Sequence, residues 1–431
     1  FNVFESRNQS KLELVFQKTD YNEIFHVPYY KNITKFMKLL GQDPRDKSST
    51  KSMIVIIVTT SIVSIILPTI IELYVSLRKK DADGVIECLP HFIASSIGLI
   101  KILNMHFNRQ NFSKLFHLVG TQWDQLKLSG QLHVLEKIVI QGNKMAQFYH
   151  NTLVSFLILY LLIPLISPIL DIIHPLNETR TRQQILRVNY LFFDGYDYFF
   201  YSYLQLLWAV SVTVFTIIGA DWLYMLIIHH NSGLFTVCGY QIQKVVSIQN
   251  YNDEVISQNY IYEKSRNSVL MHKEAIGFFM LLDKSSQISY LIQVGLNMLG
   301  MSATAVQTVV NIHRPEIAMR NAVFCGASQF HLLLLSLPGQ VLLDSCSTLA
   351  DNMYIPIKDS NKVHYTYQDR YNSAWYATPV KIQKLLYVMQ IRCKKLCSLT
   401  AGGLYDMNIE NFGIAFKTCM SYITMMMSLR D

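Results

Sequence analysis

The sequence predicts an all-α membrane protein, and three observations support this fold class. Hydrophobic residues make up 51% of the 431 residues and charged residues only 16%, against about 25% charged in ordinary soluble domains. The mean hydropathy of +0.21 is nevertheless low for a chain buried wholly in lipid. Long apolar stretches therefore alternate with water-exposed segments, and the length suffices for about six to eight spans of roughly 20 residues each.

Seven apolar stretches are predicted to be transmembrane helices. The first, third, fourth and sixth are strong in length and purity. Because the second contains Lys101 and His106 and the seventh contains Lys417, we expect these two helices to face protein or water rather than lipid. The seven stretches are residues 53–77, 85–107, 148–173, 198–228, 288–310, 318–345 and 404–429.

Basic residues set the predicted orientation. Residues 1–52 contain nine Lys and Arg residues, whereas the segment 174–197 contains three. The positive-inside rule then places the N-terminus in the cytoplasm and the C-terminus outside. The basic segment 78–80 would then lie outside, which disagrees mildly with the positive-inside rule. Asn177 starts a sequon, Asn177-Glu178-Thr179, in a predicted outer loop and is a glycosylation candidate.

The segments between the predicted spans are long on the cytoplasmic side. Apolar residues recur at helical spacing in 109–147, 229–287 and 346–403, so we expect the helices to continue below the membrane and pack together as an anchor domain. The chain then divides into a cytoplasmic N-terminal segment (1–52), six transmembrane helices with cytoplasmic extensions (53–345), a cytoplasmic loop and anchor helix (346–403), and a terminal helix (404–431).

No enzyme motif or metal-binding pattern is present, and we expect no catalytic site, no cofactor and no metal. The seven cysteines show no framework spacing and are expected to be free thiols. Lys101 and Glu72 are expected to extend to the membrane interface, and Asp221 to be a solvated or hydrogen-bonded helix-end residue. The net charge of +8 is explained by basic residues beside membrane spans rather than by a nucleic-acid partner.

The C-terminal quarter carries an ordered set of motifs that resembles the insect odorant receptor family. Ala220-Asp221 followed by the patch 229–240 is similar to the hymenopteran members of that family. The motifs of the C-terminal quarter are Ser373-Ala374-Trp375-Tyr376, Pro379, Lys381, the run 385–392, Leu399-Thr400-Ala401-Gly402, Asn411-Phe412, Lys417-Thr418 and Ser421-Tyr422-Ile423-Thr424.

This resemblance implies a ligand-gated, non-selective cation channel in the plasma membrane of a sensory neuron dendrite. Family members form tetramers around one pore and have a split last helix, of which the terminal half lines the pore. The segment between the fourth and fifth spans is short, which is typical of odour-tuned subunits rather than the shared co-receptor. The expected partners are co-receptor subunits in a heterotetramer, a small volatile organic ligand, membrane lipid and permeant cations.

The resemblance also assigns residues to the pore. Matching the terminal motif makes Met425 and Leu429 the gate, and a ring of bulky apolar side chains blocks ions by dewetting. The polar stripe that lines the pore beside them is Ser421, Thr424 and Ser428. The alternative is that these side chains simply face neighbouring helices.

The ligand pocket is implied to lie among the second, third, fourth and sixth spans. A site for a small apolar ligand needs aromatic and aliphatic walls with one or two polar contacts. Helix packing explains the same residues equally well. The candidates that meet this requirement are Phe92, Ser95, Ser96, Thr152, Phe156, Leu204, Trp208, Phe324 and Ser328.

Two other functions stay open at this stage. A gustatory-type channel for sugars or bitter compounds would have more polar side chains in the pocket spans. A transporter or membrane enzyme would show inverted repeats or clustered intramembrane carboxylates, and neither is seen in the sequence.

Overall fold

The structure is a computed structural model, and it describes residues 27–43, 49–174, 184–193, 195, 197–249, 258–352 and 379–428. Its first part contains α2 (Pro28–Leu39), α3 (Ser49–Arg78), α4 (Ala82–Phe107), α5 (Arg109–Leu128) and α6 (Leu132–Leu162). A short 3-10 helix η2 (Ile163–Leu165) and α7 (Ile166–Ile173) follow. The long helices are α8 (Phe199–Gln249), α9 (Gln258–Val310) and α10 (Pro315–Asn352). The chain closes with α11 (Val380–Cys393), strands β1 (Thr400–Ala401) and β2 (Tyr405–Asp406), and α12 (Ile409–Ser428).

The predicted all-α fold is confirmed. In the described part of the chain, five helical segments are long and apolar enough to cross a membrane: Thr50–Arg78, Ala82–Phe107, Leu132–Ile173, Phe199–Lys244 and Pro315–Asp351. The other two predicted spans, 288–310 and 404–429, fall on α9 and α12, which do not meet that standard.

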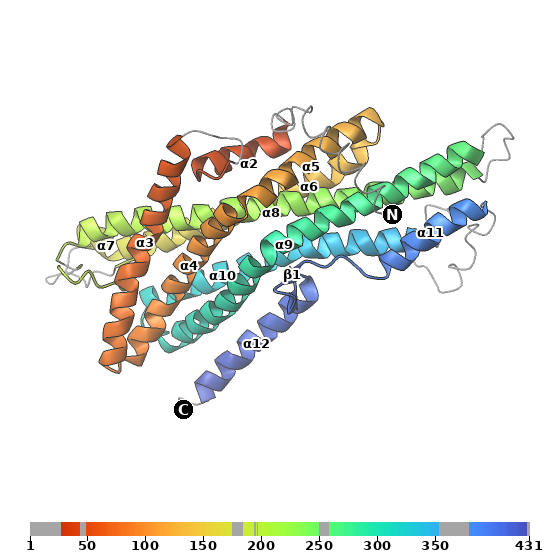
Figure 1. Ribbon diagram of the computed structural model, residues 1–431. Coiled ribbons are helices and arrows are strands. Elements are labelled where there is room, and N and C mark those ends of the chain that lie inside the picture. The colour runs from red at the N-terminus through yellow and green to blue at the C-terminus, as the bar shows by residue number, and fades with distance from the viewer. Residues whose placement is uncertain are drawn as a thin grey trace.

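The long helices reach well beyond a bilayer. With 51 and 53 residues, α8 and α9 measure about 75 to 80 Å at 1.5 Å per residue, against a hydrocarbon core of about 30 Å. Figure 1 shows α8, α9 and α10 running along the length of the molecule, with α11 beside their far ends. The expected helical extensions are therefore present. They bury a continuous core in which Tyr149, Phe235 and Phe278 are among the largest enclosed side chains.

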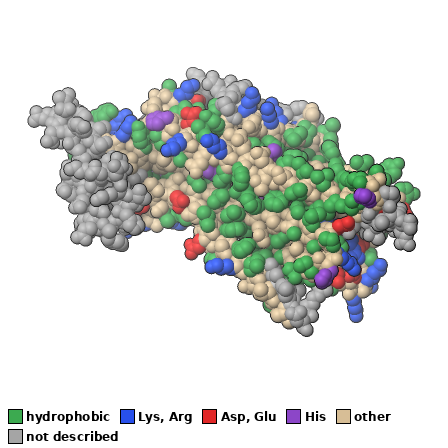
Figure 2. All heavy atoms as spheres, turned by 180° about the vertical axis from the view of Figure 1, so that it is seen from behind, with side chains coloured by type: hydrophobic (Ala, Val, Ile, Leu, Met, Phe, Trp, Pro, Cys, Tyr) green, Lys and Arg blue, Asp and Glu red, His purple; other side chains and the backbone are tan. Residues whose placement is uncertain are grey.

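Apolar side chains also cover much of the outer surface. Figure 2 shows them spread broadly over the half of the molecule opposite the far ends of α8 and α9, with Lys and Arg gathered toward its margins. Exposed examples include Leu162, Ile172 and Leu204. Large exposed apolar surfaces of this kind suit a lipid environment rather than water. The chain is thus a multi-pass membrane protein.

Two predicted spans differ in detail from the structure. The span 148–173 is interrupted at η2, because Pro164 lacks the N–H that an α-helical hydrogen bond requires. The predicted span 404–429 becomes helical only at Ile409, because β1 and β2 pair as an antiparallel hairpin before it. Gly402 and Gly403 form the turn with φ of +62° and +70°, which side-chain-bearing residues rarely adopt.

The hairpin connects α12 to the bundle. The Gly402 N–H donates to the Gln287 carbonyl at 3.0 Å, and the Thr400 N–H donates to Asp283 Oδ1 at 3.0 Å, both on α9. On α10, a Cβ at Gly339 would lie 1.8 Å from the Met407 carbonyl oxygen, so only glycine permits this approach. The start of α12 is therefore anchored to α9 and α10.

Candidate ligand site

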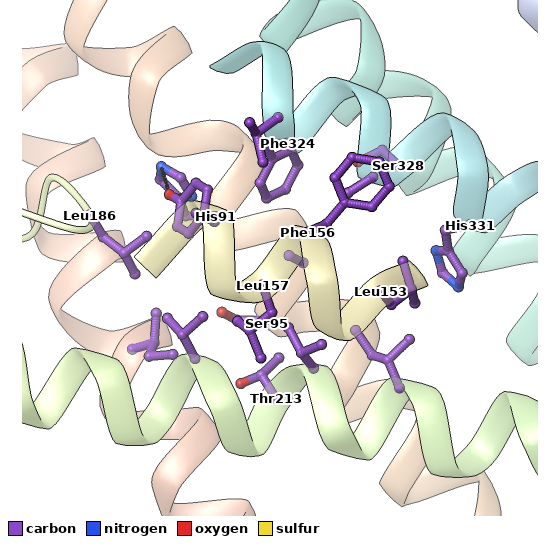
Figure 3. Close-up of a pocket in the computed structure, with 18 residues that line it drawn as sticks. His91, Ser95, Leu153, Phe156, Leu157, Leu186, Thr213, Phe324, Ser328 and His331 are labelled. Carbon is purple, nitrogen blue, oxygen red and sulfur yellow. Dashed lines mark hydrogen bonds between the residues drawn. The ribbon is translucent and has the colours of Figure 1, made fainter. Parts of the chain in front are cut away.

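A cavity of about 140 Å³ lies among α4, α6, α8 and α10. Figure 3 shows side chains from these helices around one common space, with Leu186 from the segment before α8 at one end and His331 at the other. Most of the lining is aliphatic or aromatic, which suits a small apolar ligand. The lining residues are Ile65, His91, Ala94, Ser95, Leu153, Phe156, Leu157, Tyr160, Leu186, Val210, Thr213, Val214, Ile217, Val323, Phe324, Ala327, Ser328 and His331.

Helical periodicity explains why these residues meet. Each helix contributes residues three or four positions apart, which lie on one helix face. The four faces are His91, Ala94 and Ser95 on α4; Leu153, Phe156, Leu157 and Tyr160 on α6; Val210, Thr213, Val214 and Ile217 on α8; and Phe324, Ala327, Ser328 and His331 on α10.

One end of the cavity is closed by a buried chain segment, residues 184–188. Ile185 and Leu186 are fully enclosed, and the Tyr160 hydroxyl donates to the Ile185 carbonyl at 3.1 Å. Tyr160 also lies 3.4 Å from Nδ1 of His91. A buried loop needs such partners for its backbone groups, and the cavity wall supplies them.

Ion pairs hold this segment in place. Arg187 contacts Glu72 on α3 at 2.8 Å, Asp81 in the α3–α4 turn at 3.0 Å and Glu87 on α4 at 3.6 Å. From α10, Arg320 pairs with Glu87 at 2.6 Å and donates to the Gln184 carbonyl at 3.0 Å. Residues 184–188 are therefore tied to three different helices.

The pKa of Asp81 lies below the ordinary 3.8 of an aspartate. The main cause is the hydrogen bond from the Gly84 N–H at 3.0 Å, and the hydrogen bond from Arg187 adds to it. A lowered carboxyl pKa means that the contact is intact above pH 3.8 and is lost only as the pH falls through the lowered value.

A buried polar network lies at the other end of the cavity. Lys101 on α4 forms an ion pair with Oδ1 of Asp221 on α8. Oδ2 of Asp221 accepts from the Tyr149 hydroxyl at 2.8 Å and from Nε2 of His331 at 3.0 Å. The amide of Gln293 on α9 lies 3.0 Å from the same imidazole nitrogen. Four helices thus meet at one carboxylate, and α9 joins the network through His331.

This network corrects the expectation for Lys101. Its side chain does not extend to the interface, because only 1% of it is exposed and Asp221, at 0%, holds it inside the bundle. A buried charge persists when a partner of opposite sign and further hydrogen bonds compensate it. Glu72 is likewise enclosed beside Arg187 rather than extended to the interface. Asp221 is hydrogen-bonded, one of the two expected alternatives, but it lies in the interior of α8 rather than at a helix end.

Four of the nine candidate pocket residues line the cavity: Ser95, Phe156, Phe324 and Ser328. The other five, Phe92, Ser96, Thr152, Leu204 and Trp208, do not. Leu204 and Trp208 are 62% and 58% exposed, and Trp208 donates to the Ser61 hydroxyl at 3.0 Å. On α8 the cavity face begins at Val210, and Leu204 and Trp208 lie on another face of the helix.

The chain matches the model of the 7tm odorant receptor family over residues 81–355. It belongs to this family. Two solved structures of the insect olfactory receptor OR5 from Machilis hrabei, one in complex with eugenol, have a similar fold to this chain. Each has a TM-score of 0.72 and 11% sequence identity, and each covers 95% of this chain and 100% of the other. No curated protein matches the receptor.

The terminal helix α12 of the receptor packs on the bundle by one face only. Ala415 and Cys419 are buried against it. The candidate pore-lining residues Ser421, Thr424 and Ser428 are all exposed. At 100° per residue they project on the side opposite Ala415. Within the described part of the chain, the polar stripe therefore faces away from the bundle, and the hydroxyls of Thr424 and Ser428 donate to carbonyls of α12 itself.

Of the two candidate gate residues, Met425 is described and Leu429 lies outside the described residues, as does Asn177. Met425 is 47% exposed and lies at the edge of an apolar groove of about 560 Å³ between α4, α9 and α12. Tyr422 lines the same groove. Met425 thus lies between the polar stripe and the side of α12 that faces the bundle.

Elsewhere in the receptor the described residues contain no group of three or more His, Cys, Asp and Glu arranged to hold a metal. All seven cysteines are buried free thiols, as the sequence predicted. His229 and His230 point to different partners: the former to the Met225 carbonyl at 2.7 Å, the latter to Gln122 at 3.0 Å.

Proposed function

We propose that this receptor is an odour-tuned subunit of a ligand-gated, non-selective cation channel. The observation that carries the proposal is the cavity of about 140 Å³, which lies among α4, α6, α8 and α10 and is lined mainly by apolar side chains. A volatile organic ligand is small and apolar, and such a site gives it contact area with few polar groups to desolvate. The same lining argues against a gustatory-type channel for sugars, because sugars require many polar contacts.

The proposed binding residues are the four candidates that line the cavity, Ser95, Phe156, Phe324 and Ser328. The ring of Phe324 lies 5.7 Å from that of His91, in an edge-to-face arrangement. Phe156 packs toward Phe330 of α10 with ring centroids 6.2 Å apart. A ligand between these aromatic rings would contact α4, α6 and α10 at once, so its binding would favour one relative position of these helices over another.

The proposed pore is formed by α12 of this subunit together with the corresponding terminal helices of three neighbouring subunits. The polar stripe Ser421, Thr424 and Ser428 would face the ions, and Met425 with Leu429 would form the constriction. The exposure of this stripe in the single chain supports the proposal, because a polar helix face at membrane depth needs water or protein beside it.

The proposed partners are co-receptor subunits in a heterotetramer, in the plasma membrane of a sensory neuron dendrite. We propose that the N-terminus is cytoplasmic and the C-terminus external. In this orientation the cavity lies in the outer half of the subunit, and the far ends of α8, α9 and α10 with α11 form the cytoplasmic anchor.

Voltage-clamp recording tests this function. The receptor is expressed in oocytes with and without an odorant co-receptor, and a panel of volatile compounds is applied. We expect inward cation currents to some compounds only in cells that contain this receptor, while the co-receptor alone does not respond to them. If the receptor reaches the cell surface with its partner and the response profile equals that of the co-receptor alone, the proposed function is wrong.

A further inference from the structure

His331 has one ring nitrogen engaged and one available to the cavity. Its Nε2 lies 3.0 Å from Oδ2 of Asp221 and 3.0 Å from the amide of Gln293. Nδ1 has no hydrogen-bond partner among the described residues. It is nevertheless not a fully enclosed atom, so a ligand can reach it. Figure 3 shows the imidazole at the end of the cavity beside Leu153.

The Asp221 carboxylate decides which nitrogen carries the proton. A carboxylate only accepts hydrogen bonds, so the nitrogen 3.0 Å from it must donate. The proton of His331 is therefore on Nε2. The side-chain oxygen of Gln293 has no other partner, and a half-turn of this amide brings that oxygen to the same N–H.

Lys101 decides the charge of the imidazole. Its ion pair with Asp221 already balances the buried carboxylate. A second proton on His331, of which 7% is exposed, would add an uncompensated charge inside the bundle, and such charges are costly. The imidazole is therefore neutral, and Nδ1 presents a lone pair that only accepts hydrogen bonds.

The hydroxyl groups of the cavity set no such requirement. The Thr213 hydroxyl donates to the Ala209 carbonyl at 2.8 Å, and the Tyr160 hydroxyl donates to the Ile185 carbonyl at 3.1 Å. The hydroxyls of Ser95 and Ser328 can both donate and accept. Both ring nitrogens of the other lining imidazole, His91, lie within 3.5 Å of the Tyr160 hydroxyl. Nδ1 of His331 has no such neighbour and demands a donor from whatever occupies the space beside it.

The volume limits the size of the occupant. A cavity of about 140 Å³ matches the roughly 150 Å³ of an engineered apolar cavity that binds benzene. One six-membered ring or a short alkyl chain fills such a space.

We propose that the receptor is tuned to ring-sized or short-chain alcohols and phenols, whose O–H donates to Nδ1 of His331. Lys101 and Asp221 act as positioning residues, because they fix the tautomer and the orientation of this imidazole. The inference rests on the proposed odorant-binding function and names the chemical class of its ligand.

Matched pairs of compounds test the inference on the purified full-length receptor. Phenol is compared with fluorobenzene, and cyclohexanol with fluorocyclohexane, because each pair has similar size and differs in the O–H donor. Binding is read from the concentration that gives half of the maximal rise in melting temperature. We expect the donor of each pair to half-saturate at a concentration about tenfold lower.

Two variants locate the effect. Glutamine in His331→Gln can still donate to Asp221 but has no polar atom in the place of Nδ1, so the ratio between the paired compounds should fall to about one. Asparagine in His331→Asn carries its amide oxygen close to the place of Nδ1, so the preference for donors should persist. Surface labelling checks that both variants fold.

The inference is overturned by a ratio near one in the wild type, by absence of binding for both pairs, or by an unchanged ratio in His331→Gln. The wild-type ratio decides alone if neither variant reaches the membrane. Currents recorded with the co-receptor separate this inference from the proposed function. Binding with donor preference but without ligand-specific currents refutes the channel function only, whereas currents without donor preference refute the ligand class only.

Discussion

Removing one member of the Lys101–Asp221 pair should destabilise the receptor strongly, whereas removing both charges should not. The Lys101 side chain is 1% exposed and that of Asp221 is 0% exposed. Asp221→Asn therefore leaves a buried ammonium group without a counter-charge. Breaking a buried pair in this way costs about 3–5 kcal/mol. Lys101→Met leaves the carboxylate unpaired and should cost a similar amount.

The double variant Lys101→Met/Asp221→Asn carries no unpaired charge. Its asparagine oxygen can still accept from Tyr149, which lies 2.8 Å from Oδ2 in the wild type. What remains is one amide N–H group facing an apolar methionine, an unsatisfied donor that costs about 1–3 kcal/mol. The two single costs add to about 6–10 kcal/mol, so the double variant should be far more stable than additivity requires.

The assay is unfolding of the purified receptor in lipid micelles, with the free energy of unfolding measured for the wild type, both single variants and the double variant. Lys114→Met on the exposed face of α5 is the matched control and should change stability by no more than about 0.5 kcal/mol. If the double variant loses the sum of the two single losses, or if each single variant loses less than about 1 kcal/mol, the pair is not a compensated buried charge.

Three further predictions concern the cavity, the pore and the buried segment. Phe324→Ala should raise the half-maximal odorant concentration at least about tenfold, because it removes a cavity wall. Trp208 lies outside the cavity, so Trp208→Ala should leave the dose–response curve unchanged. The reverse result would move the binding site to the outer face of α8. Met425→Ala should raise the basal current or alter channel block because it thins the proposed apolar constriction, and currents equal to wild type in both respects would remove Met425 from the gate. Arg187→Met should lower the protection of the amides in residues 184–188 against hydrogen exchange, because it removes ion pairs to three carboxylates. Protection is the intrinsic exchange rate at the given pH divided by the observed rate. Since the pKa of Asp81 is below 3.8, its contact with Arg187 should cause no loss of protection in the wild type between pH 7 and pH 5, and a loss that Asp81→Asn abolishes would contradict this.

Helical periodicity in the sequence led to four residues of the cavity lining and to five residues outside it. The spacing of Phe324 and Ser328 was sufficient to find the cavity face of α10, and continuing it by three residues reaches His331, which the prediction omitted. On α8 the aromatic character of Trp208 directed the prediction to a face other than that of the cavity, because aromatic residues favour lipid-facing and interface positions as well as pockets. The periodicity of one helix shows that it has faces but not which neighbour each face meets.

The hairpin before α12 shows a different kind of failure. The run from Leu404 onward is apolar enough to read as the start of a helix, yet Gly402 and Gly403 adopt positive φ and the chain pairs with itself. The two adjacent glycines were the local signal for this turn. The close approach of the Met407 carbonyl to Gly339 of α10 could not be predicted from the sequence, because the two residues lie more than sixty positions apart.

The sequence by itself determined the membrane class, the apolar stretches, the helical continuation beyond them, the free thiols and the family, because composition, periodicity and short motifs are local properties. The tertiary structure decided which polar residues meet. Lys101, Tyr149, Asp221 and His331 are separated by up to 230 positions, and each alone resembles an end-of-helix or interfacial residue. Only the packing of α4, α6, α8 and α10 brings them to one carboxylate, where burial makes their mutual compensation necessary.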